Sequence, residues 1–257
     1  MREGLEEICE RSVIHWRGTE MAADFRYEVE WMDGRKIGSF FASPNMIEEA
    51  VIGYLLMRGL SRDIRVRERI KRGDLEYLLR ITEERELYPP QWKDDPVEWD
   101  VILNLMSDLS KSIPKSMCPF AFHVTGLYAL RGSSVVRKML LVDISRHTAA
   151  MKIAGWVMRH NEDFKELTPV MISTGRISGD IIKLLSVTRI KIVASMRHVL
   201  VSGAASADQI GITLISKDFT RNLKVFTHPE RVVGGPRVSK GGPLVRWHGK
   251  EADSPLC

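Results

Sequence analysis

The feature that most constrains the fold is the alternation of short apolar runs with amphipathic stretches in the second half of the chain. The apolar runs have the length and the bounding turn residues of buried strands, and they occupy Leu140–Val142, Pro169–Ser173, Lys191–Ser195 and Gly211–Ser216. The stretches between them place apolar residues at the spacing of one helical face, within Ala150–Met158 and Ile181–Leu185, and a further helix is expected within Val199–Gln209. Strands separated by helices indicate crossover connections, which produce a parallel or mixed sheet with helices packed on it. The predicted fold class is therefore α/β (α+β), with Lys224–Thr227 as a last strand.

The first part of the chain predicts a β-hairpin followed by a helix. Apolar and charged residues alternate in Phe25–Trp31, as in a half-buried strand, and Asp33-Gly34 separates this run from Arg35–Phe41. An Asp-Gly pair favours a tight turn because glycine tolerates positive φ. Ser43-Pro44 is typical of the N-cap and first position of a helix, which we expect to end at Gly59.

Residues 61–116 differ from both flanking parts. Basic and acidic side chains crowd between residues 62 and 74, which is typical of a solvated helix or strand face. Proline-containing stretches interrupt regular structure before residue 97. Val97–Leu109 is predicted to form one more helix. After Val232, two Gly-Gly-Pro sequences flank basic residues, as in a mobile tail. We therefore expect an N-terminal β-hairpin and helix part with a charged insertion (1–116), an α/β domain (117–232) and a flexible basic tail (233–257).

Composition narrows the class of protein without identifying it. The longest apolar runs are too short to span a bilayer, and Met1–Glu10 lacks the basic and apolar regions of a signal peptide. We therefore expect a cytoplasmic protein that does not associate with membranes. The net charge of +5 at pH 7 fits an ordinary soluble protein. It equally fits a protein that binds the phosphates of a nucleotide-like molecule or of a nucleic acid.

Neither the cysteines nor the histidines form a metal-binding pattern. The three cysteines, Cys9, Cys118 and Cys257, are too widely spaced for a disulfide framework or a zinc site, and they fit a reducing compartment. No two histidines stand at metal-ligand spacing with a third ligand nearby, so we predict no protein-bound metal. Surface or hydrogen-bonded core positions are expected for His123, His160, His198 and His228.

The sharpest local pattern is the turn Thr174–Ser178, which lies where the carboxyl end of a predicted strand meets a helix N-terminus. Ligands of open α/β sheets bind outside such strand ends, and the free N–H groups of a helix start favour an anion. Gly175 permits close approach of a ligand to the backbone, Thr174 and Ser178 offer hydroxyls, and Arg176 offers a bidentate fork for phosphate. The alternative interpretation is an ordinary turn with a surface arginine and Ser178 as a helix cap.

A second strand-to-helix junction, Asp143–His147, places two basic residues in a first helical turn. Arg146 and His147 oppose the helix dipole there, so they do not serve helix stability. An anionic partner would explain them, and the alternative is that Asp143 simply pairs with Arg146. Ser145 or Asp143 is expected to cap this helix.

Cys118 is the candidate catalytic residue among the cysteines, and Pro119 and Phe120 follow it. Its thiol would be reactive if a helix N-terminus or an arginine stabilised the thiolate. The alternative is a small buried hydrophobic residue beside aromatic side chains.

Five segments in fixed order between residues 24 and 232 resemble a known family. They are Ala42-Ser43-Pro44 with Glu49–Leu60, Phe120–Gly126, Asp143–Lys152, Ser173–Lys183 and Val225–Val232. They resemble, respectively, the ASP…ALGFLLxEGI, FxxTGG, EDVGRHNAxDK, SGRxSxExxxK and YTHPxRL segments of the formate dehydrogenase accessory protein family (FdhD).

This resemblance implies a fold, a reaction and partners. The fold would be a cytidine-deaminase-like mixed sheet with helices behind an N-terminal β-hairpin and helix part, in a family whose members often form homodimers. The reaction would carry sulfur from a cysteine desulfurase to the molybdenum-bis(molybdopterin guanine dinucleotide) cofactor of formate dehydrogenase. A guanine-nucleotide-like ligand would thus occupy a basic pocket.

The resemblance also implies site residues. Arg146, His147, Gly175, Arg176, Ser178 and Lys183 match family positions, and Thr174 joins them from the turn described above. The family's cofactor-contacting segment corresponds to Lys217–Asn222, where Phe219 and Arg221 supply similar groups at shifted positions and Lys217 is a further candidate for cofactor binding.

The sequence departs from the family where sulfur is carried. The family's CGxCG loop corresponds to residues 66–100, which contain no cysteine. A thiolate is the group that attacks and carries a sulfane sulfur. Two functions therefore stay open, namely sulfur transfer through Cys118, and binding or delivery of a molybdopterin or guanine nucleotide without persulfide chemistry. A basic nucleic-acid-binding module is the third alternative.

Overall fold

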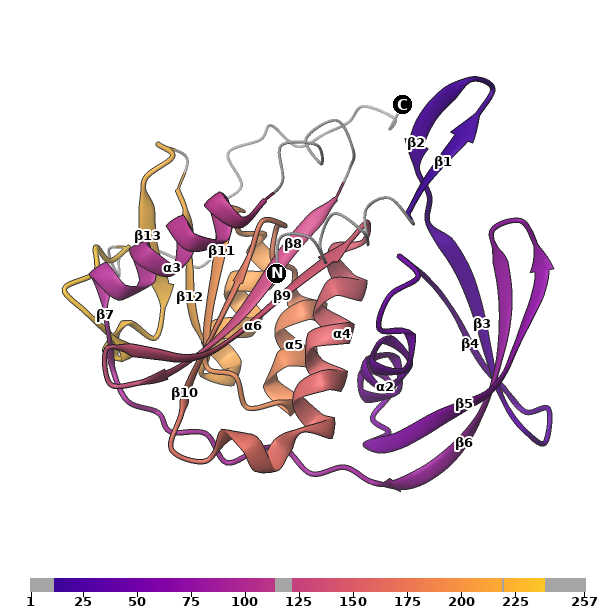
Figure 1. The fold of residues 1–257 in the computed structure, drawn as a ribbon. Helices are drawn as coiled ribbons and strands as arrows, with labels where there is room; N and C mark the ends of the chain where they lie inside the picture. Colours follow the sequence, from indigo (N-terminus) through magenta and orange to yellow (C-terminus); the bar gives the residue numbers. More distant parts are fainter. Residues whose placement is uncertain (1–11, 114–121, 219, 239–257) are drawn as a thin grey trace, which may run out of the picture.

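A six-stranded mixed sheet forms the centre of the second half of the chain in the computed structural model, which describes residues 12–113, 122–218 and 220–238 (Figure 1). Its strand order is β13-β12-β11-β10-β8-β9. Strands β10, β11 and β12 run parallel, as predicted, while β8–β9 is an antiparallel hairpin and β13 is antiparallel to β12. The strands are β8 (His123–Arg131), β9 (Ser134–Asp143), β10 (Thr168–Ser173), β11 (Ile192–His198), β12 (Thr213–Lys217) and β13 (Leu223–Thr227).

Helices cover both faces of this sheet because its central strands are apolar on both sides. Met171 packs into the cluster formed with α4 and α5, whereas Val170 and Ile172 on the same strand pack into the cluster formed with α3. Helix α6 lies against β12 and β13. The predicted fold class is confirmed. The helices are α3 (Trp99–Ser112), α4 (Arg146–Arg159), α5 (Gly179–Val187) and α6 (Val201–Ile210).

The N-terminal part contains a four-stranded sheet of order β4-β3-β6-β5. The predicted hairpin is confirmed as β3–β4, and the charged insertion, for which the sequence left helix or strand open, forms the long antiparallel hairpin β5–β6. A small hairpin, β1–β2, projects beside this sheet (Figure 1). The strands are β1 (Val13–Trp16), β2 (Thr19–Ala22), β3 (Phe25–Trp31), β4 (Lys36–Ala42), β5 (Arg62–Gly73) and β6 (Glu76–Glu86).

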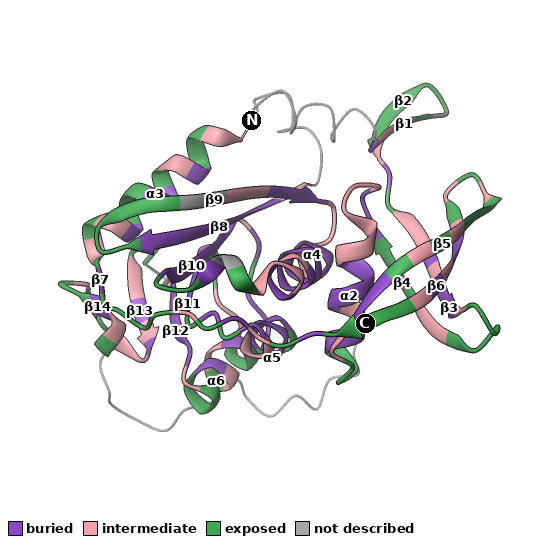
Figure 2. Ribbon diagram, turned by 60° about the horizontal axis from the view of Figure 1, so that its bottom comes forward, coloured by how far each residue is buried: buried purple, intermediate pink, exposed green. Residues whose placement is uncertain are grey.

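Helix α2 (Ile47–Met57) joins the two parts by packing closely on α4. A Cβ added to Gly53 of α2 would come within 2.1 Å of the Met151 carbonyl oxygen, and one added to Gly155 of α4 would come within 2.1 Å of the Glu49 carbonyl oxygen. The two helices therefore approach as they do only because both contact positions lack a side chain. Figure 2 shows the buried faces of α2 and α4 continuing into β8 and β10.

The predicted start of this helix at Ser43-Pro44 is wrong. Helix α2 begins at Ile47 after Met46, which has φ 49° and makes no side-chain cap hydrogen bond. Ser43 is fully buried, its hydroxyl accepts a hydrogen bond from Ile144 N–H (3.3 Å), and its own N–H donates to Asp143 (3.2 Å). The buried Asp143 carboxylate at the end of β9 needs hydrogen-bond partners. Ser43 is therefore held by these tertiary contacts instead of capping a helix.

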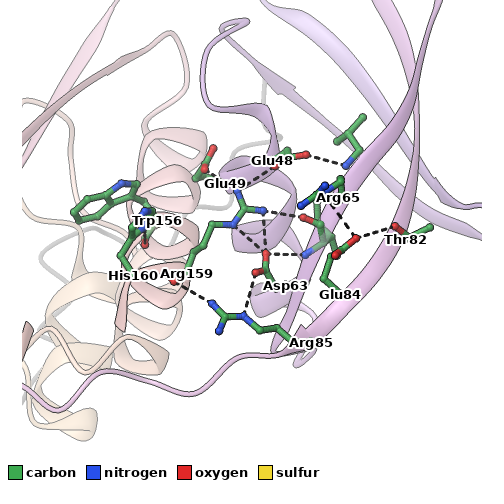
Figure 3. A network of polar contacts seen from close by, with 12 residues as sticks. Glu48, Glu49, Asp63, Arg65, Thr82, Glu84, Arg85, Trp156, Arg159 and His160 are labelled. Carbon is green, nitrogen blue, oxygen red and sulfur yellow. Dashed lines mark hydrogen bonds and ion pairs between the residues drawn. The ribbon is translucent and has the colours of Figure 1, made fainter. Parts of the chain in front are cut away.

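Arg159, the last residue of α4, ties the four-stranded sheet to the rest of the molecule (Figure 3). Its guanidinium donates to Glu48 (3.1 Å) and Glu49 (2.9 Å) of α2, and to Asp63 of β5 (3.0 Å). It also donates to the Ile64 carbonyl (2.8 Å). The two parts are thus joined by a charged network in addition to the apolar packing of α2 on α4.

The connection from β6 to α3 runs along the sheet edge at which β10 and β11 begin. Trp92 donates to the Thr188 carbonyl (2.9 Å), and the N–H of Lys93 donates to the Leu167 carbonyl (2.9 Å) just before β10. Asp94 accepts hydrogen bonds from two basic side chains. The connection then forms β7 (Val97–Glu98), which pairs in parallel with β14 (Val232–Val233). It is therefore held along much of its length.

The beginning of the predicted C-terminal tail lies against β13. Val225 N–H donates to the Pro236 carbonyl (2.8 Å), and Val238 N–H donates to the Val225 carbonyl (3.1 Å). Residues 239–257 lie outside the described part of the chain. Helix α3, which the predicted boundary at residue 116 assigns to the N-terminal part, packs against β8 and β10.

None of the described helices has both the length and the apolar character needed to cross a membrane.

Candidate functional site

A cleft of about 780 Å³ opens at the edge of the six-stranded sheet where β10, β11 and β12 end. Because β8 is antiparallel to β10 and β9 is antiparallel to β8, the start of β8 and the end of β9 lie at the same edge. The cleft is lined by Ile113, Phe122, His123, Val124, Arg146, Thr174, Gly175, Arg176, Met196, Arg197, His198 and Lys217.

Four cationic side chains from four different segments converge on this cleft. Arg146 comes from the first turn of α4, Arg176 from the β10–α5 turn, Arg197 from β11 and Lys217 from the end of β12. None of the described residues that line the cleft is acidic. The Arg146 Nε–H is buried and has no hydrogen-bond partner within the described structure. Since buried donors are normally satisfied and like charges repel, an anion in the cleft would complete the site.

The glycine of the predicted turn lets two segments meet. A Cβ on Gly175 would come 2.9 Å from Arg146 Cβ and 3.3 Å from His123 Nδ1. Gly175 N–H donates to the Ser173 hydroxyl (3.0 Å), and Thr174 Oγ1 accepts from Val124 N–H (2.9 Å). The turn is therefore fixed to its own strand and to the start of β8, with Arg146 and His123 directly against it.

Two histidines of this region, His123 and His147, have a lowered pKa. Burial, then the positive charges of Arg146, Arg197 and Arg176, lower the pKa of His123 below its ordinary value. Burial and Arg146 likewise lower the pKa of His147, against a smaller opposite effect from Asp180. Both imidazoles are therefore neutral near pH 7 in the free protein. An anion bound beside them would favour their protonated forms.

The alternative pairing of Asp143 with Arg146 is not what the structure shows. Asp143 pairs with Lys152, whose Nζ lies 2.5 Å from its Oδ2. Ser145 caps α4 as predicted, because its hydroxyl accepts from Thr148 N–H (3.3 Å). With Asp143 occupied by Lys152, Arg146 is left to face the cleft.

The structure brings together five of the predicted site residues. Arg146, Thr174, Gly175, Arg176 and Lys217 line the cleft. His147 and Ser178 instead contact each other, with 3.2 Å between Nε2 and Oγ. Ser178 is the N-cap residue of α5 by position, but its hydroxyl makes no cap hydrogen bond.

Of the four remaining predicted residues, the structure describes two. Lys183 and Arg221 are exposed and are not among the residues that line it. Cys118 and Phe219 lie outside the described residues. Within the described ranges, no three His, Cys, Asp or Glu side chains are grouped as metal ligands would be.

Sequence reasoning missed three polar residues of the cleft, His123, Arg197 and His198. The two histidines were expected at surface or hydrogen-bonded core positions, and Arg197 was not singled out. Arg197 and His198 come one residue after the apolar run Lys191–Ser195, much as Arg176 comes shortly after Pro169–Ser173. Since neighbouring parallel strands end at one edge, the polar residues after the third strand carried the same signal as those after the second.

Comparisons with known proteins agree with one another. A model of the FdhD/NarQ family matches residues 76–233, a range that includes every residue of the cleft lining. A sulfur carrier protein FdhD from Methanothermobacter thermautotrophicus is 24% identical over 215 residues, covering 76% of this chain and 84% of that protein. One from Bacillus licheniformis is 25% identical over 248 residues, covering 83% and 90%.

A solved structure from Desulfotalea psychrophila, described as a formate dehydrogenase accessory protein, has the same fold. It superposes with a TM-score of 0.62 at 21% identity and covers 86% of this chain and 97% of that one.

Proposed function

Because the chain belongs to the FdhD/NarQ family, we propose that it is an accessory protein of molybdenum-dependent formate dehydrogenase and binds a molybdopterin guanine dinucleotide in its basic cleft. The observation that carries this proposal is the convergence of Arg146, Arg176, Arg197 and Lys217 without an acidic residue in the described lining. Each nucleotide end of such a cofactor presents a diphosphate, which supplies the missing negative charge.

The residues of the cleft would contact the phosphate groups in different ways. The planar guanidinium groups of Arg146 and Arg176 suit bidentate contacts to phosphate oxygens, and Lys217 adds a mobile point charge. Gly175 and Thr174 bring backbone and hydroxyl groups to the same place. Each charge-assisted contact contributes roughly 1.5–3 kcal/mol.

Co-purification tests this proposal. The wild-type protein and an Arg146→Gln/Arg176→Gln variant are expressed in a host that makes the guanine dinucleotide cofactor, and bound pterin is measured by fluorescence after oxidation. The wild type is expected to carry pterin and release guanosine monophosphate on hydrolysis, and the double variant is expected to lack both. An Arg131→Gln variant, altered at an exposed position at the end of β8, serves as the control. Equal pterin content in the wild type and the double variant would contradict the proposal.

Sulfur transfer through Cys118 is the second candidate function. Ile113 and Phe122, which both line the cleft, are the described residues on either side of the Cys118 segment. The connection from β6 to α3 has no cysteine and is held at the opposite edge of the sheet. Cys118 is therefore our candidate for carrying sulfur, with a cysteine desulfurase as donor and formate dehydrogenase as the enzyme served.

Mass spectrometry separates the two functions. The protein is incubated with a cysteine desulfurase and cysteine, and the mass of the peptide that contains Cys118 is measured under non-reducing conditions. A gain of one sulfur that is lost in Cys118→Ala would make the protein a sulfur carrier. An unchanged mass would leave cofactor binding and delivery as its function.

A further inference from the structure

The strand pair β11–β12 is interrupted where it reaches the cleft. Ala194 pairs with Ile215 and His198 pairs with Lys217, so residues 195–197 of β11 face the single residue Ser216 of β12. Such bulges are rare between parallel strands, and they redirect side chains next to functional sites. Two residues of the bulge, Met196 and Arg197, line the cleft, and Arg197 is the cation of the two.

Two fully buried serines satisfy the backbone that the bulge leaves without ladder partners. The Ser195 hydroxyl accepts a hydrogen bond from Arg197 N–H (3.1 Å), and the Ser216 hydroxyl donates to the Arg197 carbonyl (2.5 Å). Arg197 is thus held at both its N–H and its C=O by side chains. In a regular sheet, backbone groups of the neighbouring strands would form these two hydrogen bonds, and neither serine would be needed.

The same Ser195 hydroxyl reaches the neighbouring turn. It donates to the Gly175 carbonyl (2.8 Å), immediately before Arg176. One hydroxyl therefore joins the segment of Arg176 to the segment of Arg197. Because both arginines line one cleft, the position of one is set relative to the other through Ser195.

We propose that Arg197 determines specificity for a diphosphate group in the cleft, and that Ser195 and Ser216 are positioning residues that hold it beside the Gly175–Arg176 turn. Two guanidinium groups on mutually fixed segments favour two linked phosphates over a single one. This inference rests on the proposed function, because it assumes that the cleft binds phosphate groups.

Calorimetric titration with inorganic pyrophosphate and with inorganic phosphate tests the role of Arg197. Arg197→Gln is expected to weaken pyrophosphate binding by about 10- to 100-fold and phosphate binding by only about two- to threefold. Arg131→Gln is the matched control and is expected to leave both affinities unchanged. An Arg197→Gln variant that binds both anions like the wild type would overturn the inference while leaving the proposed function intact.

A double-mutant cycle tests the serines. Ser216→Ala is expected to weaken pyrophosphate binding by about three- to tenfold in the wild-type background and to have no further effect in the Arg197→Gln background. A merely structural serine would cost the same in both backgrounds, and that result would overturn its positioning role. Ser216→Thr, which keeps the hydroxyl, is expected to bind like the wild type.

If Ser216→Ala does not fold, Ser195→Ala is carried through the same cycle with Ser195→Thr as its rescue. If the wild type binds neither anion, both the proposed function and this inference fail.

Discussion

Lys152 Nζ lies 2.5 Å from Asp143 Oδ2, and both side chains are entirely buried. The same ammonium group donates to the Ser43 carbonyl (3.0 Å) and to Asn45 Oδ1 (2.9 Å). The other Asp143 oxygen accepts from Ser145 N–H (2.8 Å). This pair therefore links the N-terminal part to the junction that presents Arg146 to the cleft.

Removing the cation of this pair is predicted to destabilise the fold strongly. Lys152→Met leaves the Asp143 carboxylate buried without its counter-ion, which costs about 3–5 kcal/mol in the free energy of unfolding. Burial raises the pKa of Asp143, and loss of Lys152 raises it further. The loss measured by urea unfolding should therefore shrink as the pH falls and Asp143 becomes protonated.

Lys191→Met is the matched control, because Lys191 pairs with Asp94 (2.7 Å) at the surface. Its expected cost is at most about 1 kcal/mol. Equal losses in the two variants would contradict the structural role assigned to the buried pair.

The Arg159 network predicts a salt-dependent loss of stability. Arg159→Met leaves Glu48, Glu49 and Asp63 close together without their common cation. Because the arginine side chain is only 20% exposed, we expect a loss of about 1–3 kcal/mol in urea unfolding at low salt. The loss should decrease in high salt, which screens the repulsion among the carboxylates. Arg65→Gln, at an exposed ion pair with Glu84 of 3.8 Å, should change stability by less than about 0.5 kcal/mol.

Gly175→Ala is predicted to impair anion binding more than stability. The new methyl group would push Arg146 and His123 away from the turn, because its carbon would lie 2.9 Å from Arg146 Cβ. We expect pyrophosphate affinity to fall by about tenfold or more, as for the loss of one charge-assisted contact. Gly73→Ala is the control, since a Cβ there meets only ordinary contacts at 3.6 Å or beyond. Unchanged affinity in Gly175→Ala would show that Arg146 does not act at this cleft.

Anion binding is predicted to strengthen as the pH falls. The pKa of His123 is lowered in the free protein by burial, Arg146, Arg197, Arg176 and His147. A bound anion opposes those charges and raises this pKa, so the complex takes up a proton and affinity grows towards acid. The growth is at most about tenfold per pH unit for each histidine involved.

Sulfate is the suitable probe for this pH dependence, because its own charge stays constant through the titration range of histidine. Affinity is measured from about pH 7.5 to about pH 5.5, on either side of the ordinary histidine value. His123→Asn should flatten the dependence. A pH-independent affinity in the wild type would mean that neither histidine senses the ligand.

The sequence predicts most of the C-terminal half, because its signals there are local. Apolar runs alternating with helical faces place β10, α5, β11 and β12, and Ser145 caps α4 as its position suggests. The start of α2 was not predictable in this way. Ser43 has the residue type of a cap, but its hydrogen bonds go to Asp143 and Ile144, a hundred residues away in sequence.

The candidate site was predictable only in part for the same reason. Arg146 and Arg176 stand in recognisable strand-to-helix junctions, so local pattern finds them. Arg197 follows an apolar run as Arg176 does, so local pattern marks its position, but the bulge that Ser216 of the next strand holds there is a tertiary feature that the pattern does not show. The partner of Asp143 was likewise settled by burial of Lys152 and not by the nearness of Arg146 in sequence.

The most direct test of the central claim is a calorimetric titration of the whole protein with GDP, with guanosine and an Arg146→Gln/Arg176→Gln variant beside it. We predict that GDP binds with a micromolar Kd, that guanosine binds far more weakly, and that the variant loses about 100-fold or more of the GDP affinity. GDP binding that is equally strong in the variant, or absent from the wild type, would contradict the assignment of the cleft as the nucleotide site.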